Sequence, residues 1–230
     1  MLEEKGIDDG PNLKWLPSSC VTFGDFDLTA AGLSSHVPHE GRRRREKMPR
    51  LPMPSDTDAF AEQTRAAVRH ILETRNSMPP PSSYLTYAGQ AGALLSDLVE
   101  YLRYHTSLSP AETELAICTS ARASNADYIW NGHVRLGLEA GVREEAIRAI
   151  DTYGPLDGLT ADEALIIGFG RELLESPQVS DQTFNAVRAR YGEQGLLELT
   201  AVMSVYTMNA NILRVMDHQA AADARHLTPR

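Results

Sequence analysis

The sequence predicts a domain built only of α-helices, and three observations lead to this fold class. From about Asp58 onward, apolar residues recur at the three- and four-residue spacing of one helix face. Residues typical of helix starts and ends separate these segments at short intervals. No segment shows the strict alternation of a strand or the turn signal of a hairpin. The loops are short enough for one all-α domain.

Composition supports a single globular domain and excludes several classes of partner. The chain has 230 residues, of which 42% are hydrophobic and 23% charged, enough for one core. The net charge of −9 gives no electrostatic support for a nucleic-acid partner. No apolar run is long enough for a membrane span. The two cysteines, Cys20 and Cys118, lie far apart, which favours a reducing cytoplasmic location over a disulfide framework.

The first 47 residues differ in composition from the rest. They contain all three lysines, whereas residues 48–230 contain 15 arginines and no lysine. Residues 1–47 are expected to form a disordered tail, residues 48–220 the helical domain and residues 221–230 a C-terminal tail. The run Arg42–Arg45 is either a patch for an anionic surface or part of a solvated tail. Met48 is a candidate for the natural start, and the N-terminus lacks a signal-peptide pattern.

The first two helices are expected on either side of a proline-rich break. The first covers about residues 58–74, with one apolar face made of Phe60, Ala67, Val68, Ile71 and Leu72. The segment MPPPSSY then interrupts the helix, because proline lacks the N–H that a helix interior needs. A second helix is expected from about Ser83 to Tyr104.

Capping residues mark the helices that follow. Ser109 and Pro110 open a helix through AETELAICTSAR, and Ser124 or Asn125 is expected to cap the next one, which ends at Gly141. REEAIRAI forms a short helix. Two further helices then open at recognisable caps, a capping box of Thr160 with Glu163 and a single cap at Ser180. The last long helix is LLELTAVMSVYTMNANILRVMD.

Glu114 and His133 are the candidate chemical residues. They lie on consecutive predicted helices joined by a short link, so the two helices can fold against each other and bring the side chains together. Glu114 is flanked by Leu115, Ala116 and Ile117, which favours an inward direction. A carboxylate and an imidazole in an apolar cleft are the ordinary composition of a proton-transfer site.

This stretch resembles the carboxymuconolactone decarboxylase and alkylhydroperoxidase D-like family. A glutamate in an "ELAI" helix is followed by a polar turn, a Y-x-W-x-x-H motif and a glycine, at Glu114, Tyr128, Trp130, His133 and Gly141. The likeness covers roughly residues 49–217. It implies an all-α bundle of about seven helices whose protomers assemble as trimers, larger rings or dimers.

The sequence departs from both branches of that family. The peroxidase branch has redox cysteines seven and four residues before the histidine, and Ala126 and Ile129 stand there in this chain. Neither side chain can form the thiolate nucleophile, so a cysteine peroxidase is disfavoured. The decarboxylase-like branch often has a glutamate where Ile129 stands. Cys118 lacks a resolving partner and is interpreted as a small core residue.

Four further residues are candidates for substrate binding. Tyr128 and Trp130 precede His133, and either bind substrate or pack in the core. Tyr206 and Asn209 interrupt an apolar helix, and either line a pocket or hydrogen-bond across a subunit interface. No metal-ligand spacing, P-loop or dinucleotide-binding motif is found, so neither a metal nor a cofactor is expected.

The first functional hypothesis is a cofactor-free lyase or isomerase. A small organic acid or lactone would bind near Glu114 and His133, and His133 would move a proton to or from carbon or a carbonyl oxygen. The alternative is a non-catalytic, oligomeric ligand-binding protein, which the missing cysteines and the missing glutamate favour. A peroxidase-like antioxidant protein is the third and disfavoured hypothesis.

Overall fold

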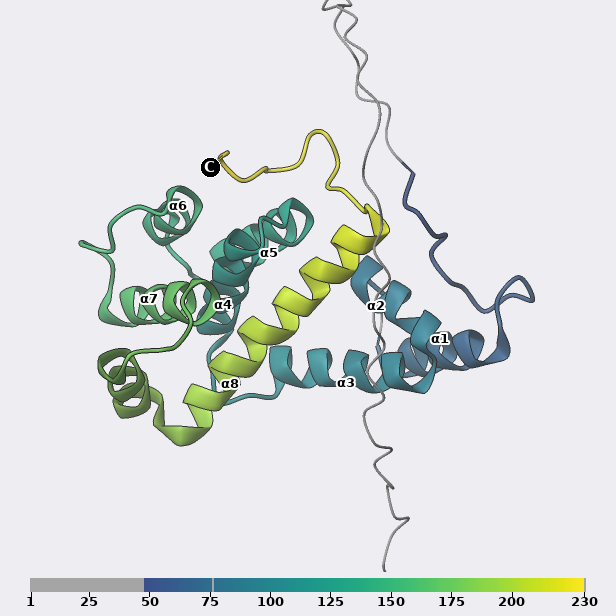
Figure 1. The fold of residues 1–230 in the computed structure, drawn as a ribbon, viewed down its shortest axis with the longest axis horizontal. Helices are drawn as coiled ribbons and strands as arrows, with labels where there is room; N and C mark the ends of the chain where they lie inside the picture. The colour runs from purple at the N-terminus through teal and green to yellow at the C-terminus, as the bar shows by residue number, and fades with distance from the viewer. Residues whose placement is uncertain (1–47, 76, 230) are drawn as a thin grey trace, which may run out of the picture. The chain divides into compact units, whose positions relative to one another are not determined.

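The computed structural model describes residues 48–75 and 77–229 (Figure 1), and in that range every regular element is helical. The elements in chain order are α1 (Glu62–Thr74), α2 (Pro80–Leu85), the 3₁₀ turn η1 (Thr86–Ala88), α3 (Gln90–Tyr104), α4 (Pro110–Ala123), α5 (Asp127–Glu139), α6 (Glu144–Thr152), α7 (Ala161–Glu175) and α8 (Asp181–Met216). The predicted all-α class is confirmed. The predicted tail, with Cys20 and Arg42–Arg45, lies outside the described residues.

Helix α4 forms the centre of the packing. It contacts α5, α7 and α8, and every residue from Thr113 to Arg122 is buried. Helix α8 runs diagonally between α4–α7 on one side and α1–α3 on the other (Figure 1). A candidate residue between Thr113 and Arg122 of α4 is therefore inside the core unless it points toward a cavity.

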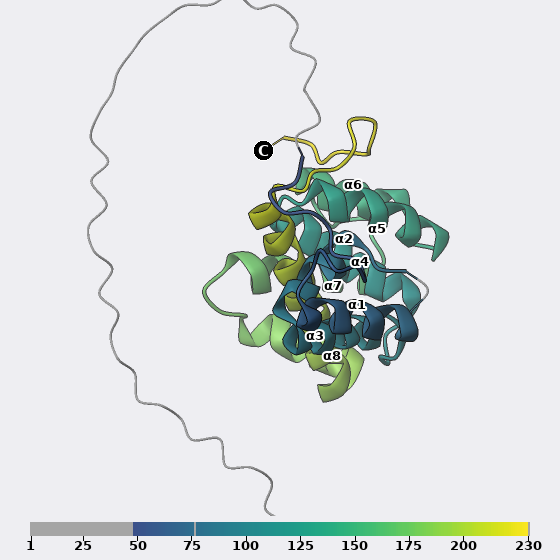
Figure 2. The same cartoon turned by 90° about the vertical axis from the view of Figure 1, so that its right-hand side faces the viewer.

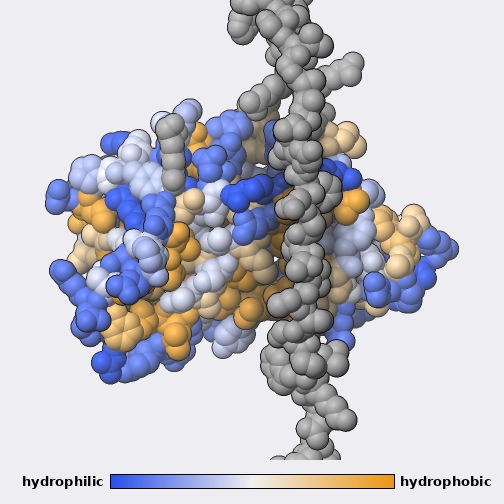
Figure 3. Space-filling view, viewed as in Figure 1, coloured by the Kyte–Doolittle hydropathy of each residue, from blue (hydrophilic) through white to orange (hydrophobic). Residues whose placement is uncertain are grey.

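On the face of the domain shown in Figure 3, apolar residues occur in separate groups among hydrophilic ones.

The predicted helix over residues 83–104 is wrong in one respect, because the chain divides it into α2, η1 and α3. The division falls at Gly89, whose φ of 58° is a left-handed conformation that favours glycine. Pro80 and Pro81 start α2 because proline suits the first turn of a helix. The sharp turn at Gly89 lets α3 fold back against the end of α2.

Gly92 is where α3 meets that end most closely, and Gly92→Ala is expected to destabilise the domain. A Cβ atom at this position would lie 1.8 Å from the backbone oxygen of Leu85, so backbone has to move. Overpacking of this kind costs about 1–3 kcal/mol or more. Urea unfolding measures the change. Gly132→Ala, in open space within α5, is the control and is expected to stabilise by about 0.5–1 kcal/mol. Equal stability of the two variants would contradict the close approach.

Other helix boundaries are partly confirmed. The caps at Ser109 and Thr160 are complete capping boxes, and the side chain of Ser180 accepts from the N–H of Thr183. The predicted cap of α5 is wrong, because Asn125 takes a left-handed φ of 50° and α5 begins after Ala126 without a side-chain cap.

The last two predicted helices form one element, α8, which is interrupted by the non-helical backbone of Gly192 (φ 68°).

The predicted apolar face of α1 is wrong at Leu72, which is 51% exposed while Ile71 is fully buried. Adjacent residues on a helix point about 100° apart, so both cannot face the same core.

The two ends of the described chain pack against the domain. The N–H of Arg50 donates to the oxygen of Met216 at 2.8 Å, which holds the first described residues beside the end of α8 (Figure 2). Leu227 is buried, and Asp127 on α5 accepts from its N–H at 2.8 Å. Asp151 on α6 accepts from both the N–H and the hydroxyl of Thr228. The segment after α8 therefore runs over α5 and α6.

Candidate functional site

Glu114 is held inside the domain by its place in α4. The helix starts at the capping box of Ser109 and Glu112, in which each side chain accepts from the backbone N–H of the other residue. Glu114 follows in the first buried turn and is 7% exposed. A buried carboxylate is costly unless it is paired.

His133 supplies one partner, as the helix order predicts. The turn between α4 and α5 is closed by the N–H of Ala126, which donates to the oxygen of Ala121 at 2.8 Å. The two helices then pack side by side. Nδ1 of His133 lies 2.6 Å from Oε2 of Glu114, and the imidazole is 14% exposed. The predicted approach of these two side chains is confirmed.

Arg103 supplies the second partner of Glu114. Its Nη2 donates to Oε1 of Glu114 at 3.0 Å, so the carboxylate bridges a guanidinium and an imidazole. Burial raises the pKa of the Glu114 carboxyl, but the hydrogen bonds and charges of His133 and Arg103 outweigh this effect and leave that pKa below its ordinary value. Glu114 is therefore ionised at neutral pH and can only accept hydrogen bonds.

The ionised carboxylate determines the tautomer of His133. Because Glu114 accepts, Nδ1 carries the hydrogen, and Nε2 of the neutral ring has the free lone pair. The rings of Tyr206 and His133 form a T-shaped contact, with centroids 5.0 Å apart at 82°, which restricts rotation of the imidazole. The pair is oriented for proton transfer through Nε2, in the arrangement of a base held by a carboxylate.

His133 opens into a cavity of about 640 Å³. The cavity is lined by residues from the end of α1, the start of α2, α3, α5 and α8, namely Arg75, Ser77, Pro79, Pro81, Ser82, Val99, Glu100, Arg103, Tyr104, Tyr128, Ile129, Asn131, Gly132, His133, Arg135, Leu136, Tyr206 and Asn209. Its volume is in the range of small-molecule sites. Three arginines and the carboxylate of Glu100 line the cavity, and each of these arginines lies within 3.2 Å of a carboxylate.

The structure brings together most of the sequence-predicted site residues. Tyr128, Tyr206 and Asn209 line the cavity with His133, and Glu114 stands behind the imidazole. Trp130 does not line it. Its indole is fully buried in the core. Burial also raises the pKa of Tyr206, so its hydroxyl is neutral at neutral pH.

Sequence reasoning missed the charged residues Arg75, Glu100 and Arg103, which line the same cavity as His133. Arg75 follows the last turn of α1, and Glu100 and Arg103 lie on α3. Nε of Arg75 lies 3.2 Å from Oε2 of Glu100. One signal was available, since Arg103 lies one residue from the buried Leu102 and four from the buried Val99. A chain with many arginines hides that signal, because most of them are on the surface.

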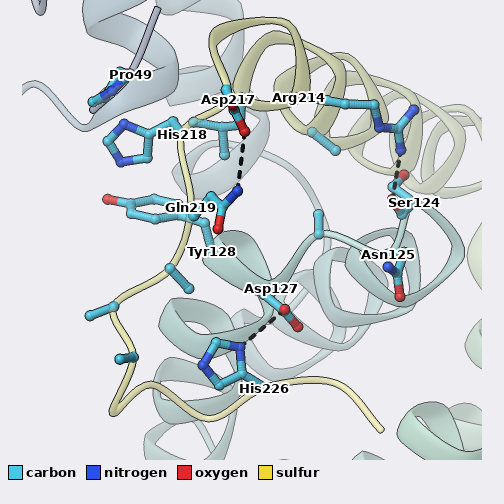
Figure 4. Close-up of a pocket in the computed structure, with 16 residues that line it drawn as sticks. Pro49, Ser124, Asn125, Asp127, Tyr128, Arg214, Asp217, His218, Gln219 and His226 are labelled. Atoms are coloured by element: carbon cyan, nitrogen blue, oxygen red, sulfur yellow. Dashed lines mark hydrogen bonds and ion pairs between the residues drawn. The ribbon is translucent and has the colours of Figure 1, made fainter. Parts of the chain in front are cut away.

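A second cavity of about 740 Å³ is also lined by Tyr128 (Figure 4). Several of its polar groups are already paired. Asp127 contacts Nδ1 of His226 at 3.0 Å, and Arg214 donates to the oxygen of Ser124 at 2.7 Å. Nδ1 of His218 lies 3.1 Å from the hydroxyl of Tyr84, and burial lowers the pKa of His218. The cavity beside His133 is therefore the stronger candidate site.

The part of the chain that the structure describes has few groups that could bind a metal ion or act as a thiol nucleophile. There, no cluster of three or more histidine, cysteine, aspartate or glutamate residues is arranged to hold a metal ion. Cys118 is completely buried. Burial and the nearby Glu114 carboxylate raise the pKa of its thiol well above the ordinary value.

Between Met48 and Pro229, with residue 76 left out, no helix has the length and apolar character of a membrane span.

Comparison with known proteins agrees with the fold. Residues 89–163 match the model of the Carboxymuconolactone decarboxylase family, which confirms the resemblance over a range that includes Glu114 and His133. A crystal structure of an alanine-substituted variant of the debrominase Bmp8, in complex with 2,3,4-tribromopyrrole, superposes with a TM-score of 0.53. It is 14% identical and covers 72% of this chain and 89% of its own, so it shows the fold. No curated protein matches the chain.

Proposed function

We propose, on the premise that residues 89–163 match the carboxymuconolactone decarboxylase family model, that the chain is a cofactor-free acid/base enzyme. Its substrate is a small organic acid or lactone that binds in the cavity beside His133. The reaction is a decarboxylation or a related lyase or isomerase step. The observation that supports this proposal is the 2.6 Å contact between Glu114 and His133 at the wall of that cavity.

In this proposal each member of the pair has its own role. Nε2 of His133 takes a proton from the substrate, or returns one after a carbon–carbon bond has broken. The Glu114 carboxylate keeps the hydrogen on Nδ1 and stabilises the imidazolium that forms. Arg103 holds the other oxygen of Glu114, so the carboxylate cannot rotate away. This is proton transfer by a positioned base, and it uses only groups of this chain.

Deuterium uptake tests the proposal without knowledge of the reaction. Small carboxylic acids and lactones are incubated with the protein in D₂O, and proton NMR follows carbon-bound hydrogen. A decarboxylation or isomerisation by His133 leaves deuterium on carbon. We expect uptake with at least one class of compound, and none with His133→Gln. If one of the compounds binds but none takes up deuterium, the result would instead support the non-catalytic ligand-binding alternative.

Cys118→Ala is expected to leave turnover within about twofold of the wild type, because a fully buried thiol with a raised pKa supplies no thiolate. The steady-state rate of the deuterium reaction measures this. A small loss of stability is expected from the cavity that the substitution leaves. A folded Cys118→Ala protein without activity would contradict the acid/base assignment and support a thiol mechanism.

A further inference from the structure

Several unpartnered polar atoms belong to residues that line the same cavity as His133. Among the described residues, the buried side-chain atoms without a hydrogen-bond partner include Nε and Nη2 of Arg75, Nε of Arg103 and Oδ1 of Asn209. All three residues line the same cavity. Buried polar groups are nearly always hydrogen-bonded, so such a cluster calls for a ligand.

The side chain of Arg75 carries two of these unpartnered atoms. Its side chain is only 7% exposed. Nη1 reaches the hydroxyl of Ser82 at 3.5 Å, and the opposite edge of the guanidinium, formed by Nε and Nη2, makes no hydrogen bond. Oε2 of Glu100 lies 3.2 Å from Nε, outside hydrogen-bond geometry, so the pair is electrostatic. An Nε–Nη2 edge matches the two oxygens of a carboxylate.

Asn209 presents the complementary requirement from α8. It is 4% exposed, and its Oδ1 lacks a donor. A carbonyl oxygen accepts hydrogen bonds, so the ligand has to bring a hydroxyl or N–H group. The lactone formed by ring closure of a simple hydroxycarboxylate has neither a negative charge nor such a donor.

We propose that the cavity selects a small hydroxycarboxylate, whose carboxylate is bound by the free edge of Arg75 and whose hydroxyl donates to Asn209, over the corresponding lactone. This inference rests on the proposed function, and it names Arg75 and Asn209 as the residues that determine specificity. Both lie outside the range that matches the family model, residues 89–163. The catalytic pair and the residues that choose the substrate thus come from different parts of the chain.

Matched sets of three compounds test the two contacts separately. One set is 2-(hydroxymethyl)benzoate, 2-methylbenzoate and phthalide, and the other is 4-hydroxypentanoate, pentanoate and γ-valerolactone. Dissociation constants are measured by NMR titration on the full chain. We expect the hydroxy acid to bind most tightly, the plain acid next and the lactone most weakly.

The variants assign those differences to residues. Arg75→Gln is expected to weaken both acids by about 10- to 100-fold, since a hydrogen-bonded charge is lost, and to leave the lactone unchanged. Asn209→Leu is expected to weaken only the hydroxy acid, by about 2- to 10-fold. Arg69→Gln is the control, because Arg69 lies on α1, the helix that ends just before Arg75, pairs with Asp56 and Glu62 and does not line the cavity.

Glu100→Gln keeps the test decisive if Arg75→Gln fails to fold. Removing the carboxylate beside Arg75 is expected to tighten binding of the acids by about 2- to 5-fold. Three results would overturn the inference. The lactone could bind as tightly as the acid, neither hydroxy acid could bind detectably, or Arg75→Gln could have the same effect as Arg69→Gln. Deuterium uptake in a protein with such a result would leave the proposed function standing, and selective binding without uptake would leave the inference standing alone.

Discussion

Replacing His133 with glutamine is expected to lower turnover by about 100- to 10,000-fold, the usual contribution of a positioned general acid or base. Glutamine can still hydrogen-bond to Glu114, but its amide group does not titrate near neutral pH and cannot act as a general acid or base. The helix and the cavity wall therefore remain while the proton carrier is lost. The measurement is the rate of deuterium uptake, with circular dichroism to show that the helical fold is retained.

His70→Gln is the matched control for this prediction. Nε2 of His70 lies 2.8 Å from Oδ2 of Asp97, so it is also a histidine paired with a carboxylate, but it lines neither cavity. Its substitution is expected to leave turnover unchanged. A folded His133→Gln protein that keeps activity within about tenfold of the wild type would exclude His133 as the essential base.

Glu114→Gln is expected to reduce both stability and turnover. The substitution preserves the side-chain volume but removes the negative charge with which Arg103 and His133 both interact. Loss of one partner of a buried ion pair costs about 3–5 kcal/mol, and we expect the lower end because Arg103 is 21% exposed. Turnover falls because the imidazolium is no longer stabilised. Urea unfolding and deuterium uptake measure the two effects.

The pH dependence of unfolding tests the same residue. The pKa of Glu114 is lower in the folded protein than its ordinary value of about 4.3. Its contribution to stability is therefore complete above about pH 4.3, and it is lost as the pH falls through the folded pKa. The difference in unfolding free energy between wild type and Glu114→Gln is expected to shrink with acidification.

Glu139→Gln is the control for Glu114→Gln. The Arg135–Glu139 pair on α5 is exposed, and an exposed helix pair contributes only about 0.3–0.5 kcal/mol. If Glu114→Gln is no less stable than Glu139→Gln, the Glu114 bridge contributes nothing to the fold, and its role in orienting His133 has to be reconsidered.

Features that depend on neighbours along the chain were predictable. The capping boxes at Ser109 and Thr160 join residues three positions apart, and helix periodicity repeats every few residues, so a short window contains both signals. The contact between Glu114 and His133 was also predictable, because their helices are consecutive and joined by a tight turn. Consecutive helices with a short link pack as neighbours.

Tertiary structure alone decided where the other groups of the site lie. The cavity combines Arg75 after α1, Arg103 on α3 and Asn209 on α8, and no local pattern relates residues so far apart in the chain. The break at Gly89 and the tight contact at Gly92 arise from the way α3 meets α2. Periodicity, local capping and chain order thus predicted most of the helices, the caps at Ser109, Thr160 and Ser180, and the Glu114–His133 pair. Long-range packing, which no window of the sequence contains, decided the cavity and the unpartnered donors and acceptor that line it.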